Sequence, residues 1–269
     1  MKLKEAFYQK RWVSRLFFFA VFAVLWEATA KLTAISPMLL PPVETVAKVL
    51  LEGITTGSLL SQTLFSLGVI LLGLAISIVL ALFLGTASYL MPFADRLTDA
   101  LTVMAHPLPG MALLPLIVIW FGTGTPAVTA VIVHACLWPI VLSMESGMRN
   151  APSVYTDLGR NFSMNRLQIV LEILLPAAVS QILSGLRIGW ARAWRALISA
   201  EMVFGAIGQY GGLGWFIFKQ RAMMNTAGLF AGILVVIAIG MAVEGLLFGK
   251  LEKATLQKWG AASGTEERA

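Results

Sequence analysis

Residues 100–144 read ALTVMAHPLPGMALLPLIVIWFGTGTPAVTAVIVHACLWPIVLSM and contain no Asp, Glu, Lys or Arg. A helix that spans a bilayer needs about 20 apolar residues, so this stretch is long enough for two crossings. Gly122, Gly124 and Pro126 interrupt it near the middle, where they favour a turn. The stretch therefore predicts a hairpin of two membrane helices.

The whole chain shares this apolar character. Of its 269 residues, 58% are hydrophobic and 13% are charged, and the mean hydropathy is +0.82. That composition is too apolar for a soluble domain of this length. Further apolar runs at about 16–32, 59–89, 167–188 and 226–248 bring the expected number of membrane helices to six. The runs are continuous rather than alternating, so we expect an all-α integral membrane protein and not a β-barrel.

Lys and Arg are distributed unevenly along the chain. With a cytoplasmic N-terminus, most of them fall in cytoplasmic segments, as the positive-inside bias requires. We therefore expect residues 1–15 to be a cytoplasmic segment, 16–250 to form the membrane domain and 251–269 to be a cytoplasmic tail. The net charge of +6 then reflects membrane orientation, and no nucleic-acid-binding motif accompanies it.

Residues that could perform catalysis or bind a metal are few. Cys136 is the single cysteine, and His106 and His134, the only two histidines, lie far apart in sequence. We predict neither a catalytic residue set nor a metal site. The chain also lacks a Gly-x-x-x-x-Gly-Lys-Ser/Thr loop, so we expect it to bind no cofactor, and any ATP to be hydrolysed by a partner.

The loop at about 149–168 is polar and has helical spacing. Pro152 suits a first helical turn, and Val154, Leu158 and Phe162 recur every four residues to form an apolar ridge. We expect a short amphipathic helix just inside the membrane, which either lies on lipid or docks in a protein groove.

The stretch from Asp157 to Pro176, DLGRNFSMNRLQIVLEILLP, resembles the cytoplasmic loop of binding-protein-dependent ABC transporter permeases. The family pattern is Glu-Ala-Ala, three residues, Gly, nine residues, Ile, one residue, Leu-Pro. The resemblance implies that the short helix docks in a cleft of a cytoplasmic ATPase and transmits its closure to the membrane helices. The implied coupling residues are Val154, Asp157, Leu158, Gly159, Phe162, Ser163, Ile173, Leu175 and Pro176. Ser163 stands where the family has glycine, and it can still turn at a conformational cost.

The resemblance extends over about residues 35–250. In this range the chain is similar to the nitrate, sulfonate, taurine and bicarbonate branch of these permeases. It rests on LLPP at 39–42, PLIVIWFGTG at 115–124, GLRIG at 185–189, and AEM at 200–202 leading to GGLG at 211–214. The branch implies a type I ABC importer permease in the bacterial inner membrane. It further implies a homodimer that meets two ABC ATPase subunits, an extracytoplasmic substrate-binding protein and the lipid bilayer, with no nucleic acid.

Several polar or aromatic residues fall in or beside the predicted helices. Ionisable residues at membrane depth are costly and therefore functional candidates. The candidates for the translocation pathway are Arg187, Arg192, Arg195, Trp194, Glu201 and His134. The three arginines, with the family branch, favour a small anionic solute; alternatively, they reach the outer interface or pair with Glu201. Gly185 and Gly189 would allow close helix contact.

A secondary transporter or channel that works alone is the alternative function. It would need buried acids for proton or sodium coupling. The few acids of the predicted helices, Glu27, Glu145, Glu172, Glu201 and Glu244, all fall near predicted ends. The glycine-rich segment 205–218 could form a partly re-entrant element at the outer end of the pathway.

Overall fold

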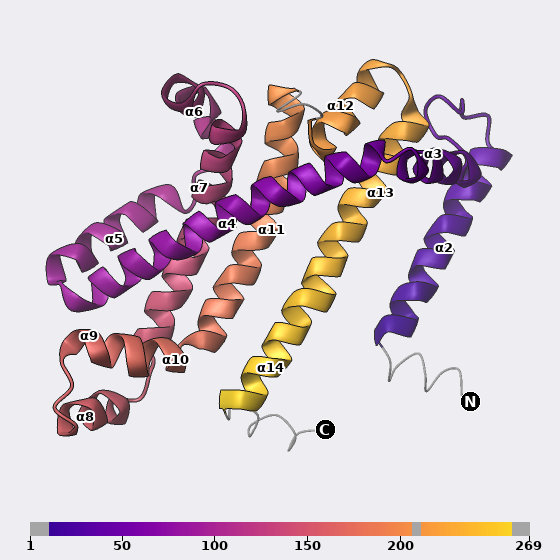
Figure 1. The fold of residues 1–269 in the computed structure, drawn as a ribbon. Helices are drawn as coiled ribbons and strands as arrows, with labels where there is room; N and C mark the ends of the chain where they lie inside the picture. The colour runs from indigo at the N-terminus through magenta and orange to yellow at the C-terminus, as the bar shows by residue number, and fades with distance from the viewer. Residues whose placement is uncertain (1–10, 206–210, 260–269) are drawn as a thin grey trace, which may run out of the picture. The chain divides into compact units, whose positions relative to one another are not determined.

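The computed structural model describes residues 11–205 and 211–259, and every regular element within these ranges is helical (Figure 1). The longer helices are α2 Arg11–Leu32, α3 Val43–Thr55, α4 Ser58–Leu90, α5 Pro92–Ala105, α7 Thr125–Arg149, α11 Val179–Phe204 and α13 Thr226–Ala242. The shorter ones are η1 Gly110–Leu113, α6 Leu114–Phe121, α8 Ser153–Asn161, α9 Arg166–Gln168, η2 Ile169–Leu174, α10 Leu175–Ala177, α12 Leu213–Ala222, η3 Val243–Phe248 and α14 Gly249–Trp259. The predicted all-α class is confirmed.

Among the described residues, three helices are long and apolar enough to cross a membrane: Ser58–Leu90, Thr125–Arg149 and Thr226–Thr255. Two bent pairs, Pro92–Ala105 with Gly110–Phe121 and Arg166–Ala177 with Val179–Phe204, raise that number to five if each pair is one span. The expected number of six stays a prediction.

The hairpin predicted from residues 100–144 is present, but its first arm is broken. The turn lies where the sequence places it, because α6 ends at Phe121 and α7 begins at Thr125, with positive φ angles of 71° at Gly122 and 116° at Gly124. Before that turn, α5 and the helical segment Gly110–Phe121 meet at an angle of 93°. Pro107 and Pro109 lie at the break, where neither can donate a backbone hydrogen bond to a continuing helix.

The helix expected over about 167–188 is present but bent within this range. The chain bends by 70° between Ala177 and Val179, and the helix that follows continues to Phe204. Pro176 lacks the N–H that would bond to residue 172, and the preceding turns of η2 are π-helical. The first helix of the bent pair therefore ends at Ala177, well inside the apolar run.

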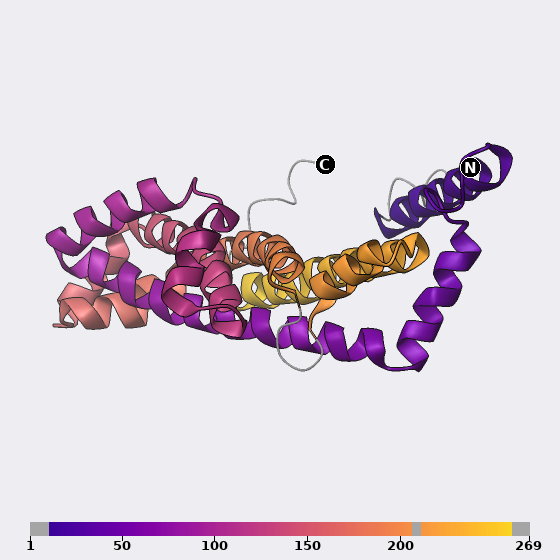
Figure 2. The same ribbon diagram turned by 90° about the horizontal axis from the view of Figure 1, so that it is seen from above.

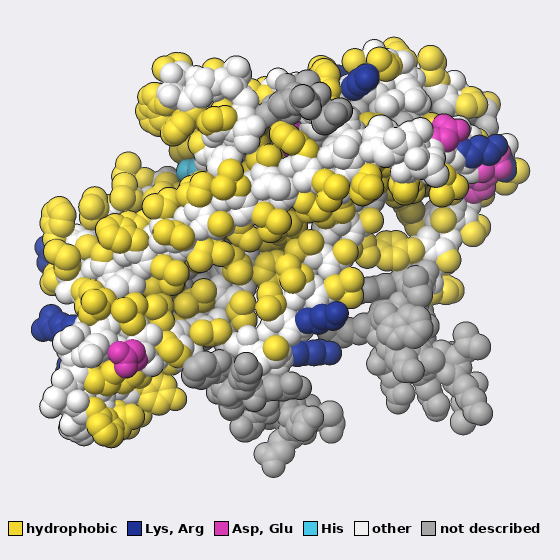
Figure 3. Space-filling model, viewed as in Figure 1, with side chains coloured by type: hydrophobic (Ala, Val, Ile, Leu, Met, Phe, Trp, Pro, Cys, Tyr) yellow, Lys and Arg dark blue, Asp and Glu magenta, His cyan; other side chains and the backbone are white. Residues whose placement is uncertain are grey.

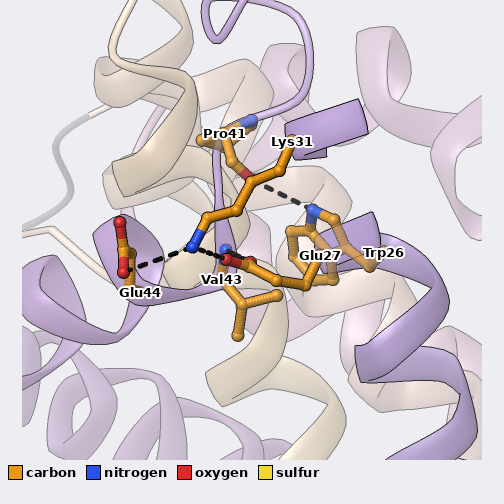
Figure 4. A network of polar contacts seen from close by, with 6 residues as sticks. All are labelled: Trp26, Glu27, Lys31, Pro41, Val43 and Glu44. Atoms are coloured by element: carbon orange, nitrogen blue, oxygen red, sulfur yellow. Dashed lines mark hydrogen bonds and ion pairs between the residues drawn. The ribbon is translucent and has the colours of Figure 1, made fainter. Parts of the chain in front are cut away.

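The chain divides into two compact units, and the first consists of residues 1–61 and 216–235. Its described core contains Val46, Ala227 and Ala231, with Trp26 and Phe230 packed against them. Polar contacts also join α2 to the chain around Val43 (Figure 4). Glu27 accepts a hydrogen bond from the Val43 N–H at 2.7 Å, and its other oxygen lies 2.6 Å from Lys31 Nζ.

The second unit consists of residues 62–215 and 236–269 and contains both candidate sites. Its central helices α7 and α11 lie side by side (Figure 2). A Cβ added at Gly189 would lie 2.8 Å from Cys136 Sγ, and one at Gly185 would lie 2.7 Å from the Pro139 carbonyl oxygen. The predicted close contact at these two glycines is therefore confirmed.

The surface of the second unit suits a lipid environment. Along α4 and α5 the visible face is covered mainly by hydrophobic side chains (Figure 3). Val79, Phe83, Phe93 and Met104 are between 66% and 76% exposed. Apolar patches of this extent are typical of membrane or protein contact surfaces.

Candidate functional site

The predicted amphipathic helix is α8, which follows the C-terminal end of α7. Pro152 is its N-cap rather than part of its first turn, and helical backbone begins at Ser153. Its ridge residues Val154, Leu158 and Phe162 are 61%, 49% and 73% exposed. A nine-residue helix with three exposed apolar side chains has little stability of its own and needs a contact partner.

The turn after α8 is fixed by two capping arrangements. The Met164 N–H donates to the Gly159 carbonyl at 3.0 Å and the Ser163 N–H to the Arg160 carbonyl at 2.9 Å, which together form a Schellman motif. Ser163 has a φ of 56°, the left-handed conformation that this motif requires and that glycine adopts without cost. The structure thus gives the physical reason for a glycine at this position in the family pattern.

A capping box begins the next helix directly. Asn165 Oδ1 accepts from the Gln168 N–H at 2.9 Å, and Gln168 Oε1 accepts from the Asn165 N–H at 2.8 Å. The two helices around Ser163 are therefore held in a defined geometry.

Gly159 brings α8 against η2. A Cβ at this position would lie 2.7 Å from Ile169 Cγ1 and 3.0 Å from Ile173 Cδ1, so a larger residue would force the two helices apart. Ile169 also belongs to the buried cluster with Met144, Met148, Val170, Leu174 and Ala178. Through these contacts α8 packs against the buried cluster between α7 and the segment that leads into α11.

A groove of 590 Å³ lies beside α8. Its walls include Tyr155 and Leu158 from the helix and Ile173 and Pro176 from the segment that leads into α11. Leu175 is half-buried and does not line the groove. Asp157 is exposed and lies 3.6 Å from Arg160, an ion pair that contributes little at such exposure.

A second cavity, of 410 Å³, lies between α7, α11 and residues 106–110, which follow α5. Of the pathway candidates, Arg192, Arg195 and His134 line this cavity, together with His106 and Trp138. Sequence reasoning did not connect His106 or Trp138 with the arginines. Pro107 and Pro109 were the sequence signal that could have indicated this contact. Two prolines break a helix, and a break in a charge-free stretch turns the chain towards the neighbouring helices.

The remaining pathway candidates lie outside this cavity. Arg187 Nη2 is 3.0 Å from Glu244 Oε1, and its Nη1 is 3.8 Å from Glu252 Oε2. The Trp194 ring stacks on Trp190 at 5.8 Å, and Trp194 Nε1 donates to the Val236 carbonyl at 3.2 Å. Within the described residues no arginine is paired with Glu201, as one alternative had suggested.

Glu201 belongs to a buried network that the sequence did not indicate. Its carboxylate accepts hydrogen bonds from Ser66 Oγ at 2.7 Å and from the Gly214 N–H at 2.8 Å. Ser66 Oγ in turn accepts from the Leu213 N–H at 2.9 Å. Gly212 is required here because an added Cβ would overlap the Glu201 carboxylate. The network attaches residues 212–214 to α4 and α11. Residues 206–210 of the expected re-entrant element lie outside the described residues.

These features define a helical membrane protein with a short amphipathic helix beside its packed helices. The comparisons with known proteins agree with this class. Residues 73–249 match the family described as "Binding-protein-dependent transport system inner membrane component". The chain belongs to this family.

Individual relatives and solved structures agree with this family. It is 30% identical over 230 residues to the taurine transport system permease protein TauC of Escherichia coli, covering 84% of this chain and 82% of that protein. It is 26% identical over 198 residues to the bicarbonate transport system permease protein CmpB of Synechococcus elongatus, covering 74% and 68%. A chain of the MetNI methionine ABC transporter, solved in inward-facing conformations, has the same fold at a TM-score of 0.59 and 17% identity, covering 73% of this chain and 96% of that one.

The predicted resemblance, fold and permease function are therefore confirmed, and the comparisons do not support the alternative of a transporter that works alone. The chain is the membrane-embedded permease of an ABC importer, a system that also contains an ATPase and a substrate-binding protein.

Proposed function

We propose that this permease forms the pathway for a small anionic solute and is driven by an ATPase that docks on α8. The observation that carries the coupling part is the exposed ridge of Val154, Leu158 and Phe162 beside the 590 Å³ groove. Exposed apolar side chains on a short polar helix are favourable only when a partner removes them from water.

The contacts of Gly159 support a route from the ATPase into the membrane helices. A push on α8 acts on Ile169 and Ile173 in η2, and η2 continues through α10 into α11. Because Gly159 leaves no space between the two helices, a movement of α8 towards η2 would displace η2. ATP and Mg stay on the ATPase, and this chain performs no covalent chemistry.

Two copies of this chain would enclose one pathway and meet two ATPase subunits, because the described part of one chain contains a single such docking helix. In this arrangement residues 16–250 form the membrane domain with the coupling loop at about 149–168, and both termini are cytoplasmic. ATP-driven closure would bring the two α8 helices together and open the pathway towards the loaded extracytoplasmic binding protein.

Two observations support an anionic solute. The curated relatives include permeases whose names specify taurine and bicarbonate import. In this chain Arg192 and Arg195 line a cavity that contains no acidic residue among its described lining residues.

The coupling proposal is tested by placing a charge on the ridge. Leu158→Asp must desolvate a carboxylate to dock, which opposes association by several kcal/mol. We expect it to lose ATPase co-purification and binding-protein-stimulated ATP hydrolysis, while the permease still folds as a monodisperse protein. Asp157→Ala is the neighbouring control, with a loss of about 0.2–1 kcal/mol, since its charge is exposed. Normal ATPase binding and transport by folded Leu158→Asp would refute the proposal.

A further inference from the structure

The cavity between residues 106–110, α7 and α11 has the size and chemistry of a binding site. Its volume of 410 Å³ falls in the range of about 300–1,000 Å³ typical of small-molecule sites. Pro107, Pro109, Ala135 and Ala196 provide apolar walls, and the polar groups come from two arginines, two histidines and Trp138.

The two arginines lie on one face of α11, in the segment that we expect to cross the membrane. Arg192 and Arg195 are three residues apart, the spacing at which helical side chains are neighbours. Arg192 is 13 residues beyond the first residue of α11, roughly 20 Å along its axis at 1.5 Å per residue. A cation at such depth is costly unless an opposite charge or water compensates it.

No carboxylate compensates either arginine within residues 11–205 and 211–259. Neither arginine takes part in an ion pair of the described residues, and Arg192 contacts only His106 within hydrogen-bond distance there, at 3.2 and 3.5 Å. A neutral imidazole has one accepting nitrogen, so at most one of these contacts is a full hydrogen bond. Most of the five guanidinium N–H donors of Arg192 thus remain available to another acceptor.

Hydrogen bonds within the protein hold the opposite wall of the cavity, formed by α7 and residues 107–109. Trp138 Nε1 donates to His134 Nδ1 at 3.4 Å, which places the His134 proton on Nε2, 3.1 Å from the Leu108 carbonyl oxygen. These bonds fix the chain between the two prolines against α7. His134 therefore positions the wall and has no donor left for a solute.

We propose that this cavity is a binding site for a small organic anion, in which Arg192 and Arg195 bind the sulfonate or carboxylate group and the proline and alanine walls contact its apolar part. Guanidinium groups suit this role, because they stay charged and can donate two parallel hydrogen bonds to one oxyanion. The inference rests on the proposed function and names the residues that would bind the solute inside the permease. It excludes Arg187, which is already paired with Glu244.

The test uses the purified complex of permease and ATPase without the binding protein, and measures ligand contact by saturation-transfer NMR. The probes are ethanesulfonate and its uncharged analogue ethyl methyl sulfone. We expect a signal from ethanesulfonate only, with an affinity about tenfold or more lower in Arg192→Gln and in Arg195→Gln. Arg192→Lys keeps the charge but loses the paired hydrogen bonds, so it should give an intermediate affinity.

Lys250→Gln is the matched control, because it removes one exposed positive charge from α14, outside the cavity, and it should bind ethanesulfonate as the wild type does. If Arg192→Gln fails to fold, Arg195→Gln alone serves as the test. Within the described residues Arg195 makes no hydrogen bond or ion pair whose loss would destabilise the fold. Equal signals from both probes, or unchanged ethanesulfonate affinity in folded Arg195→Gln, would overturn the site. Release of the ATPase by Leu158→Asp in the same preparations would show that the proposed coupling still stands.

Discussion

Ser66 and Glu201 form a buried contact in which each hydrogen bond has a clear physical consequence. Both residues are at most 1% exposed. A carboxylate buried so completely is stable only if donors surround it, and Ser66 Oγ and the Gly214 N–H provide them. The same hydroxyl accepts from the Leu213 N–H, so one serine satisfies two groups at once.

We predict that Ser66→Ala lowers the free energy of unfolding by about 2–3 kcal/mol, because it leaves the Leu213 N–H without an acceptor and removes a donor from a buried acid. Ser77→Ala is the matched control in the same helix. Ser77 is also fully buried, but its strongest bond, of 2.7 Å, goes to the Gly73 carbonyl of its own helix. Thermal unfolding in detergent should show the larger loss for Ser66→Ala. Equal losses would mean that the network contributes no special stability.

At the scale of the elements, the turn between α8 and α9 contains an unfavourable backbone conformation that one substitution should relieve. Ser163 has a φ of 56°, and a residue with a side chain pays about 1–2 kcal/mol for this conformation. Glycine removes that cost but gains freedom in the unfolded chain, so Ser163→Gly should stabilise the protein by about 0.5–1 kcal/mol.

The measurement is the unfolding temperature of the purified permease, with Ser153→Gly as the control. Ser153 is exposed in the first turn of α8, where glycine brings no conformational gain. We expect the temperature to rise for Ser163→Gly and to stay level or fall for Ser153→Gly. A fall for Ser163→Gly would show that its hydroxyl matters more than its backbone.

Sequence patterns predicted the elements where one signal dominated. The charge-free runs located α4, α7 and α13, the glycines at 122 and 124 located a turn, and the four-residue spacing from Val154 located α8. They failed where apolarity continued through a break. The runs around Pro107 and Pro176 look uninterrupted in hydropathy, but the chain bends by 93° near Pro107 and by 70° just after Pro176.

The candidate sites could be predicted only in part for a related reason. A pattern along one element indicates the ridge of α8, but the partners of Arg192 and Glu201 come from residues 86 and 135 positions away. Those contacts depend on how the helices pack, which local spacing does not contain. His106 and Ser66 are therefore found in the structure and not in the sequence.

For the molecule as a whole, the distribution of Lys and Arg predicts its orientation in the membrane. We expect α8 to lie in the cytoplasm and the segment after α12 to face outwards. Single cysteines at Ser153 and Met223, both exposed, are introduced in a Cys136→Ala background and treated with a membrane-impermeant thiol reagent in intact cells. Met223→Cys should be labelled and Ser153→Cys should react only after the membrane is opened. The reverse pattern would overturn the orientation.

The central claim is that α8 is the surface on which the ATPase acts, and site-specific photocrosslinking in native membranes tests it most directly. A photoreactive amino acid is placed at Val154 or Phe162, and at Leu39 as a control that is 74% exposed but lies in the loop between α2 and α3. We predict crosslinks to the ATPase from Val154 and Phe162, and none from Leu39. Absence of the ATPase from the Val154 and Phe162 products, in a permease that still transports, would contradict the account.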